Sequence, residues 1–272
     1  MTRSISVVTT FHKKGYDDYG SKMIDTFLVN WPKNVKLFVY AENCQVTQTA
    51  ENLIVLNLLE KSPELVAFKQ KWKSVPKANG DILKVSHLSS RKDRHKSFKW
   101  DAVRFSHKVY SIFHCVKTCN SDLLLWMDAD MICHSVITEN TILQLCPSDK
   151  DLCFLGRKGK FTECGLYAMN LQSQPTQHFL KHFQLFYDDA ENGIFRLAEW
   201  HDSFVFDAVR KNHRLNELDW SGHLITGEGH PLINCEWGAY LDHLKGDRKD
   251  YGHSKQQDLR VKRTEQYWNN II

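Results

Sequence analysis

The sequence predicts an α/β fold, a single domain in which helices flank a mostly parallel central sheet. Two observations lead to this prediction. From the N-terminus to Asp130, short apolar or β-branched runs alternate with stretches of helical period, an order typical of parallel sheets with crossover helices. The 272 residues, 42% hydrophobic and 25% charged, suit one large domain and exclude a disordered or coiled-coil chain.

The N-terminal part of the chain contains three expected strands and one expected helix. The strands are rich in β-branched and apolar residues and are predicted at residues 4–10, 35–40 and 53–58. The helix is predicted between the first two strands, at residues 22–31, and it ends before Pro32. Met23, Phe27 and Trp31 are expected on its buried side.

Residues 69–99 carry ten Lys or Arg against only Asp81 and Asp93, with Trp72 and Phe98 among them. Scattered Gly, Pro and Ser predict a basic loop excursion on the surface. Such a tract is most simply a solvated surface segment. The alternative is a mobile loop that attracts an anionic partner, such as a phosphate-bearing donor or nucleic acid.

A strong helical pattern follows at residues 98–116, with Ser97 as the expected N-cap. Its apolar positions recur at the spacing of one buried stripe; they are Ala102, Phe105, Val109, Ile112 and Val116. Arg104 and Lys108 are four residues apart and are expected to share another face of the helix. They are either solvated or close to a ligand bound at the next element.

The chemistry is expected at Asp128 and Asp130, which directly follow the apolar run 123–127 (LLLWM). This run fits a central strand buried on both faces, and open α/β sheets bind ligands at the carboxyl ends of such strands. Two carboxylates beside so apolar a run repel each other unless a cation binds them. Hard oxygen ligands suit Mg²⁺ or Mn²⁺, which commonly bridge a diphosphate.

Composition limits the binding partners and the cellular compartment expected for the protein. The formal charge of +4 does not by itself indicate a nucleic-acid binder. No apolar run approaches the roughly 20 residues needed to cross a bilayer, and the start of the chain lacks the apolar core of a secretion signal. Eight cysteines without paired C-x-x-C spacing predict reduced, mostly buried thiols in a cytoplasmic protein rather than a zinc site.

Residues 124–130 (LLWMDAD) resemble the D-x-D region of nucleotide-sugar-dependent glycosyltransferases of the Rossmann-like GT-A fold. Residues 243–249 (HLKGDRK) resemble the H-x-x-G-x-x-K segment of the glycogenin and bacterial galactosyltransferase group. The resemblance implies a catalytic domain over residues 1–250, followed by a C-terminal tail at 251–272. It also implies that Asp128, Asp130 and His243 bind the metal.

The same resemblance assigns residues to the donor. It places Ala129, Gly246 and Lys249 at the nucleoside-diphosphate sugar, with Gly246 and Lys249 at its phosphates. Arg104 and Lys108 are expected to add positive potential there. Residues 9–11 (TTF) resemble the end of the first strand of the fold, which places Thr10 and Phe11 at the nucleobase.

Two internal segments resemble the family with departures. Residues 163–170 (ECGLYAMN) match the strand along the donor sugar, which places Gly165 there, but Glu163 stands where Asn is usual. Residues 199–204 (EWHDSF) match the family's D-Q stretch, with Asp202 at the Asp position and Ser203 at the Gln position. Asp202 and Glu199 are therefore the catalytic candidates, and retention or inversion at the anomeric carbon stays open. Asp202 is alternatively the N-cap of a helix over 203–209.

The implied function is metal-dependent transfer of a sugar, most simply from a UDP-sugar, to an acceptor hydroxyl, with Mn²⁺ or Mg²⁺ as cofactor. The acceptor is either a glycan or a hydroxymethylated base in DNA bound through the basic segment 69–99, in the cytoplasm of a cell or of an infected host cell. Two other classes fit the residues: a nucleotidyl- or phosphoryl-transfer enzyme with paired carboxylates, and a non-catalytic carbohydrate- or nucleic-acid-binding module with a Trp stacking surface.

Overall fold

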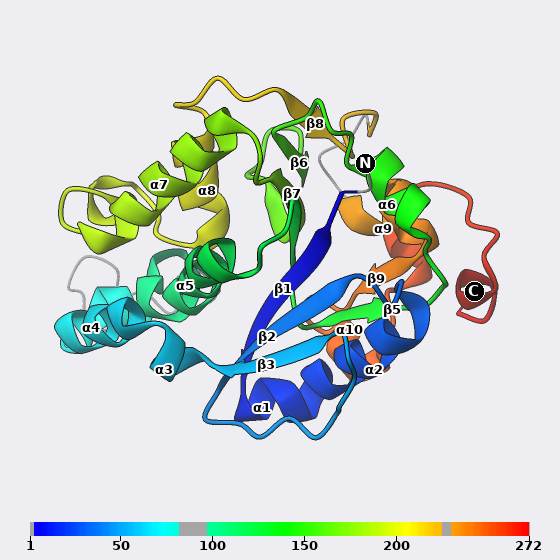
Figure 1. The fold of residues 1–272 in the computed structure, drawn as a ribbon, viewed down its shortest axis with the longest axis horizontal. Coiled ribbons are helices and arrows are strands. Elements are labelled where there is room, and N and C mark those ends of the chain that lie inside the picture. The colour runs from blue at the N-terminus through cyan, green and yellow to red at the C-terminus, as the bar shows by residue number, and fades with distance from the viewer. Residues whose placement is uncertain (1–2, 82–96, 225–229, 272) are drawn as a thin grey trace.

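A computed structural model describes residues 3–81, 97–224 and 230–271 and confirms the predicted α/β architecture (Figure 1). Its main sheet has seven strands in the order β3-β2-β1-β4-β7-β6-β8. The strands are β1 (Ile5–His12), β2 (Lys36–Glu42), β3 (Leu53–Asn57), β4 (Leu123–Met127), β6 (Leu152–Leu155), β7 (Glu163–Asn170) and β8 (Glu217–Asp219). All pairs of neighbouring strands are parallel except those that β7 makes with β4 and β6.

The reversed direction of β7 positions the site. Because β7 runs against β4, its first residues lie beside the last residues of β4, with Leu166 opposite Met127. The pairing continues one step further, where the backbone N–H of Asp128 donates to the carbonyl of Gly165 over 2.8 Å. The start of β7, from Glu163 to Gly165, therefore borders the loop that carries the two acids.

A second, two-stranded sheet joins distant parts of the chain. β5 (Met131–Cys133) and β9 (Leu241–His243) pair antiparallel, with Met131 opposite His243. The loop between β4 and β5 contains both acids, so this pairing fixes His243 beside them. Each of these two strands is so short that periodicity in the sequence could not reveal it.

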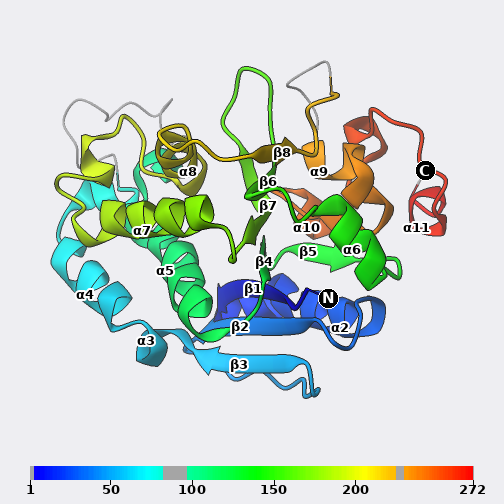
Figure 2. The same cartoon turned by 45° about the horizontal axis from the view of Figure 1, so that its top comes forward.

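Helices cover both faces of the main sheet (Figures 1 and 2). Alternate residues of β4 point to opposite faces: Leu125 packs in the core with α2, whereas Trp126 packs with α4, α5, α7 and α8. The helices are α1 (Lys13–Gly15), α2 (Ser21–Asn30), α3 (Leu58–Lys61), α4 (Pro63–Trp72), α5 (Ala102–Thr118), α6 (Glu139–Leu145), α7 (Gln174–Asp188), α8 (Asp202–Arg210), α9 (Pro231–Asn234), α10 (Arg248–Tyr251) and α11 (Gln266–Asn269).

One expected helix start and one alternative N-cap are wrong. The helix predicted from Phe98 begins at Ala102, and its N-cap is Asp101, whose carboxylate accepts from the backbone N–H of Arg104. Residues 97–100 instead form a 3₁₀ turn, in which the carbonyl of Lys99 accepts from the backbone N–H groups of Trp200 and His201. At α8 the N-cap is His201 rather than Asp202, which is the first residue of the helix.

The predicted basic excursion differs in part from the expectation. Residues 69–72 complete α4, and Pro76–Asn79 forms a 3₁₀ turn, so the tract is not a loop throughout; its residues 82–96 lie outside the described ranges. The tail packs into the core through Trp268, whose side chain is fully buried. Across the described ranges, no helix combines the length and apolar character of a membrane span.

Candidate active site

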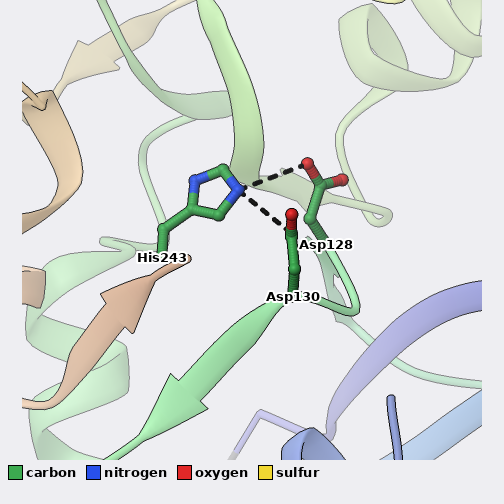
Figure 3. Close-up of side chains that lie close together, drawn as sticks. All are labelled: Asp128, Asp130 and His243. Carbon is green, nitrogen blue, oxygen red and sulfur yellow. Dashed lines mark hydrogen bonds and ion pairs between the residues drawn. The ribbon is translucent and has the colours of Figure 1, made fainter. Parts of the chain in front are cut away.

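The two acids and His243 converge at the end of β4, as Figure 3 shows. The His243 ring nitrogen Nε2 lies 3.1 Å from Oδ1 of Asp130 and 3.8 Å from Oδ2 of Asp128. One ligand atom from each of the three side chains lies within 4.8 Å of the others. Ala129 between the acids is buried in the core, which leaves the two carboxylates to face outward together.

This donor set fits a divalent cation. The two carboxylates suit both Mn²⁺ and Mg²⁺, and the imidazole favours Mn²⁺ of the two. The other ring nitrogen of His243, Nδ1, is buried and has no hydrogen-bond partner among the described residues, whereas Nε2 points to the acids. A cationic side chain already lies against the site, because Nζ of Lys249 is 2.8 Å from Oδ2 of Asp130.

The charges of the site shift the pKa values of its acids in opposite directions. Burial raises the pKa of Asp128, and Asp130 adds to the increase, although Lys108 opposes it. Burial would also raise the pKa of Asp130, but the nearby His243 and Lys249 outweigh it and hold that pKa below its usual range. Additional positive charge would therefore stabilise the ionised carboxylates, mainly that of Asp128.

Lys108 connects the metal candidates to the catalytic candidate. Its ammonium group, buried beneath the site, lies 3.1 Å from Oδ1 of Asp128 and 2.9 Å from Oδ2 of Asp202, and it also donates to the carbonyl of Cys164. The ring of Trp126 lies beneath it, 4.7 Å away. Burial would lower the pKa of Lys108, but the two carboxylates raise it well above the usual value, so the side chain stays charged.

The two catalytic candidates have different surroundings. Asp202 lines the cleft, and although burial opposes the shift, Lys108 holds its pKa below the usual value. Glu199 is held from two sides: one oxygen accepts from Lys99 and the other lies 2.9 Å from Nε2 of His201. Both acids line the cleft, but only Asp202 is joined through Lys108 to the metal candidates.

A cleft of about 1650 Å³ opens over these residues. Most of the sequence-predicted site residues line it: Arg104, Asp128, Asp130, Gly165, Glu199, Asp202, His243, Gly246 and Lys249. Gly165 is required there, because a Cβ at this position would lie 2.6 Å from Cε1 of His243. Gly246 adopts a positive φ of 67°, which favours glycine at this turn.

Four predicted donor residues lie away from the cleft lining. Lys108 and Ala129 are buried beneath it, and Phe11 is buried against Tyr16. The Thr10 hydroxyl donates to the carbonyl of Tyr40. Tyr19 is closer to the site, since Nζ of Lys249 lies 4.4 Å from its ring centroid.

A buried ion-pair network at Glu163 was not expected from the sequence. Lys245 lies 2.7 Å from one oxygen of Glu163, and Arg157 lies 3.3 Å from the same oxygen. Burial would raise the pKa of Glu163, but Lys245, His243 and Arg157 hold it below the usual range. The sequence held one sign of this network, because Glu163 stands where the resembled motif usually has Asn. A buried carboxylate needs cationic partners, whereas the amide of Asn does not.

Comparisons with known proteins support no assignment from sequence, because no family model matches the chain and no curated protein matches it. Among solved structures, it is similar to the glycosyltransferase GlyE of Streptococcus pneumoniae TIGR4, with 11% identity and a TM-score of 0.46 over 80% of this chain and 45% of that one. It is also similar to the bifunctional glycosyltransferase WbbM, with 8% identity and a TM-score of 0.48 over 98% of this chain and 47% of that one. The chain thus spans under half the length of these two proteins.

A third similar structure is the galactosyltransferase LgtC, determined in complex with donor and acceptor sugar analogues. Its identity to this chain is 9% and the TM-score is 0.47, over 98% of this chain and all of that one. All three structures are described as glycosyltransferases.

Proposed function

We propose that the protein is a metal-dependent glycosyltransferase that moves a sugar from a nucleoside-diphosphate sugar to an acceptor hydroxyl. The observation that carries the proposal is the convergence of Asp128, Asp130 and His243 in one cleft, beside the lysine of the same C-terminal motif. The three side chains would hold Mn²⁺ or Mg²⁺. When bound, such an ion supplies positive charge that stabilises a diphosphate leaving group.

The residues around the ion have complementary roles in this proposal. Lys249 and Arg104 line the same cleft and would add positive charge at the diphosphate. Asp202 is proposed to lie at the donor sugar. Its depressed pKa makes it a weak proton acceptor at neutral pH, so it suits stabilising positive charge at the anomeric carbon and orienting hydroxyls better than general-base catalysis. The proposed nucleotide of the donor is UDP, and the proposed acceptor is a glycan or a hydroxymethylated base in DNA.

The cellular setting is also part of the proposal. All eight cysteines are free and seven of them are buried. Unpaired thiols of this kind suit a reducing compartment, which supports action in the cytoplasm.

The first test is donor binding and turnover. A thermal-shift series with UDP-, GDP- and CMP-sugars, each with and without Mn²⁺, identifies the donor, because a ligand bound only by the folded state raises the melting temperature. Asp130→Asn is expected to reduce Mn²⁺-dependent release of nucleoside diphosphate by more than about 100-fold, since even the residues that orient metal ligands contribute roughly 10- to 100-fold.

The matched control is Asp149→Asn, an exposed carboxylate outside the cleft, which is expected to behave as the wild type. Undiminished turnover of Asp130→Asn, together with insensitivity to EDTA, would refute the proposal. Release of pyrophosphate in place of nucleoside diphosphate would assign the site to nucleotidyl transfer instead.

A further inference from the structure

One wall of the cleft, beyond Asp202, is aromatic. The rings of Phe98, Phe105 and Phe161 surround the ring of His201, with centroid distances of 5.6, 6.2 and 5.5 Å. All four side chains line the cleft, although they come from the 3₁₀ turn before α5, from α5, from the β6–β7 connection and from the start of α8. Phe98 is 43% exposed, so part of this aromatic cluster is accessible to a ligand in the cleft.

The aromatic cluster carries no charge of its own. Burial lowers the pKa of His201, although Asp202 and Glu199 oppose the shift, so the ring is neutral at pH 7. Its Nε2–H donates to Glu199 and its Nδ1 accepts from the backbone N–H of Phe204, which fixes the plane of the ring. The cluster is thus a neutral aromatic surface next to a catalytic candidate, and its three phenyl rings are inclined to the His201 ring by 57–65°.

Positively charged side chains line the same cleft. Within the described ranges, no ion pair joins Arg104, Lys158 or Lys160 to a carboxylate, and all three side chains are exposed. Lys158 and Lys160 flank Gly159 at the tip of the β6–β7 connection, which projects beyond both strands in Figure 2. Arg104 approaches from α5, which places positive charge on two separate walls of the cleft.

The acids of the cleft do not neutralise these cations. Glu199 pairs with Lys99, and Glu163 pairs with Lys245 and Arg157. Asp219, which has no cationic partner among the described residues, instead accepts from the backbone N–H groups of Gly156 and Ser221. The outer part of the cleft therefore has an excess of positive charge around a neutral aromatic wall.

We propose that this part of the cleft binds the acceptor, and that the acceptor is a nucleic-acid strand with an unpaired base against the aromatic cluster and its phosphates at Lys158 and Lys160. The inference rests on the proposed glycosyl transfer and specifies its acceptor. Sequence-tolerant single-strand binding combines these two features, base stacking on aromatic rings and a cationic track for the backbone. A neutral glycan would leave the cations without partners, and a phosphorylated glycan would supply charge without a planar base.

The first experiment measures binding of a fluorescein-labelled single-stranded DNA oligonucleotide, about a dozen nucleotides long, by anisotropy between about 50 and about 200 mM KCl. The variant Lys158→Ala/Lys160→Ala is expected to weaken binding and to flatten the dependence of log affinity on log salt by about 1.4, because each phosphate contact on a single strand contributes about 0.7 to that slope. The matched control, Lys117→Ala/Lys181→Ala, removes two exposed lysines near the far end of α5. Equal losses in both variants, or an unchanged slope in the first, would overturn the inference.

The second experiment separates stacking from charge. Phe98→Leu keeps an apolar side chain at a half-exposed position and is expected to weaken DNA binding by roughly five- to a hundredfold, with the salt slope unchanged. Inorganic polyphosphate is expected to compete poorly against the DNA. Wild-type affinity in Phe98→Leu, competition by polyphosphate at equal charge concentration, or binding of a phosphorylated oligosaccharide in place of DNA would each overturn the inference.

The outcomes also distinguish this inference from the proposed function. A protein that binds a sugar nucleotide with Mn²⁺ but does not bind the DNA at the lowest salt concentration refutes only the acceptor. A protein that binds the DNA but neither binds nor cleaves any sugar nucleotide with Mn²⁺ refutes the glycosyl transfer on which the inference rests.

Discussion

A single buried ammonium group contacts two carboxylates that the reaction is proposed to use. Lys108 lies within 3.1 Å of both Asp128 and Asp202, and its side chain is buried. Removal of one partner from such a buried group leaves the other charges without compensation. The resulting loss of folding stability is larger than the stability that the intact ion pairs contribute.

We therefore predict that Lys108→Met lowers the free energy of unfolding by about 3–5 kcal/mol at pH 7 in EDTA. In the variant, burial raises the pKa of both carboxylates above their unfolded values, so the lost stability returns as the pH falls and they become protonated. The difference from the wild type should shrink from pH 7 toward pH 4 in urea titrations. Lys117→Met, at an exposed site, should change stability by no more than about 0.5 kcal/mol. A pH-independent difference would contradict this account.

Gly165 limits the position of the His243 ring. A methyl group there would lie 2.6 Å from Cε1 and 2.8 Å from Nδ1 of the imidazole, which is too close for either to stay in place. Gly165→Ala is predicted to displace the ring from the two acids and to weaken Mn²⁺ binding by about tenfold or more. The added methyl group should also lower the free energy of unfolding by about 1–3 kcal/mol, because it overpacks the site. Isothermal titration with Mn²⁺ measures this, and Gly222→Ala, which meets only ordinary contacts, is the control. Equal Mn²⁺ affinity in the two variants would show that the ring tolerates the methyl group.

These residues differ in how far the sequence could reveal them. Asp128 and Asp130 were predictable because a buried strand and the acids that follow it are contiguous in the chain. His243 depended on the resemblance, since a lone histidine carries no local signal. The ion pairs of Lys108 and Glu163 join distant parts of the fold, so only the folded structure shows them. Lys108 reaches the loop after β4 and the start of α8, and Glu163 reaches the turn after β9.

At the scale of elements, the strand assignments were close because apolar runs bounded by turns are strong signals. The run at residues 123–127 forms β4 with the predicted bounds. The helix starts were wrong where tertiary contacts competed with local propensity: Lys99 bonds to the segment before α8, which holds residues 97–100 in a 3₁₀ turn and delays α5. The antiparallel direction of β7 was not predictable, because a buried run reads alike in either direction.

Glu42, the last residue of β2, joins that strand to two helices. Its carboxylate accepts from Lys69 of α4 and lies 3.0 Å from Nε2 of His107 in α5. The hydrogen bond from His107, together with Lys69, lowers the pKa of Glu42 to about 2, although burial opposes the shift. A carboxylate with a depressed pKa stabilises the fold fully above its unfolded pKa and loses that contribution as the pH falls through the folded value.

Glu42→Gln is therefore predicted to lower the free energy of unfolding by about 1–2 kcal/mol at pH 7, a figure that allows for solvent screening of a half-buried group. The difference from the wild type should narrow as the pH falls from about 4.5 toward about 2. Urea titrations at pH 7, 4.5 and 3 measure it, with exposed Glu236→Gln as the control. A difference that widens on acidification would contradict the assigned role of Glu42.

The metal candidates depend on the C-terminal segment, residues 251–271. His243 lies on β9, and the preceding Asp242 is fully buried. Its carboxylate accepts from the backbone N–H of Ser254 over 2.7 Å and from the hydroxyl of Tyr267 over 2.8 Å. This segment, predicted from the sequence as a C-terminal tail, therefore helps to fix the strand that carries a metal candidate.

Trp268 anchors the C-terminal segment. It is fully buried, its Nε1–H donates to the carbonyl of Gly238 over 2.7 Å, and its ring packs against His134 and Tyr267. Trp268→Ala is predicted to cost about 3–5 kcal/mol in unfolding free energy, as for other large buried aromatics. Because the segment also holds Asp242, the same variant should bind Mn²⁺ more weakly at temperatures where it remains folded.

Tyr267→Phe separates the two effects, since it keeps the ring and removes one donor to the buried carboxylate of Asp242. Its predicted cost is about 1–3 kcal/mol, and the loss of Mn²⁺ affinity should accompany it although the core contacts of Trp268 remain. Urea denaturation and Mn²⁺ titration of the two variants measure both quantities. If Trp268→Ala were as stable as the wild type, the segment would not belong to the core. If Tyr267→Phe lost stability but bound Mn²⁺ unchanged, β9 would hold His243 in place without support from the C-terminal segment.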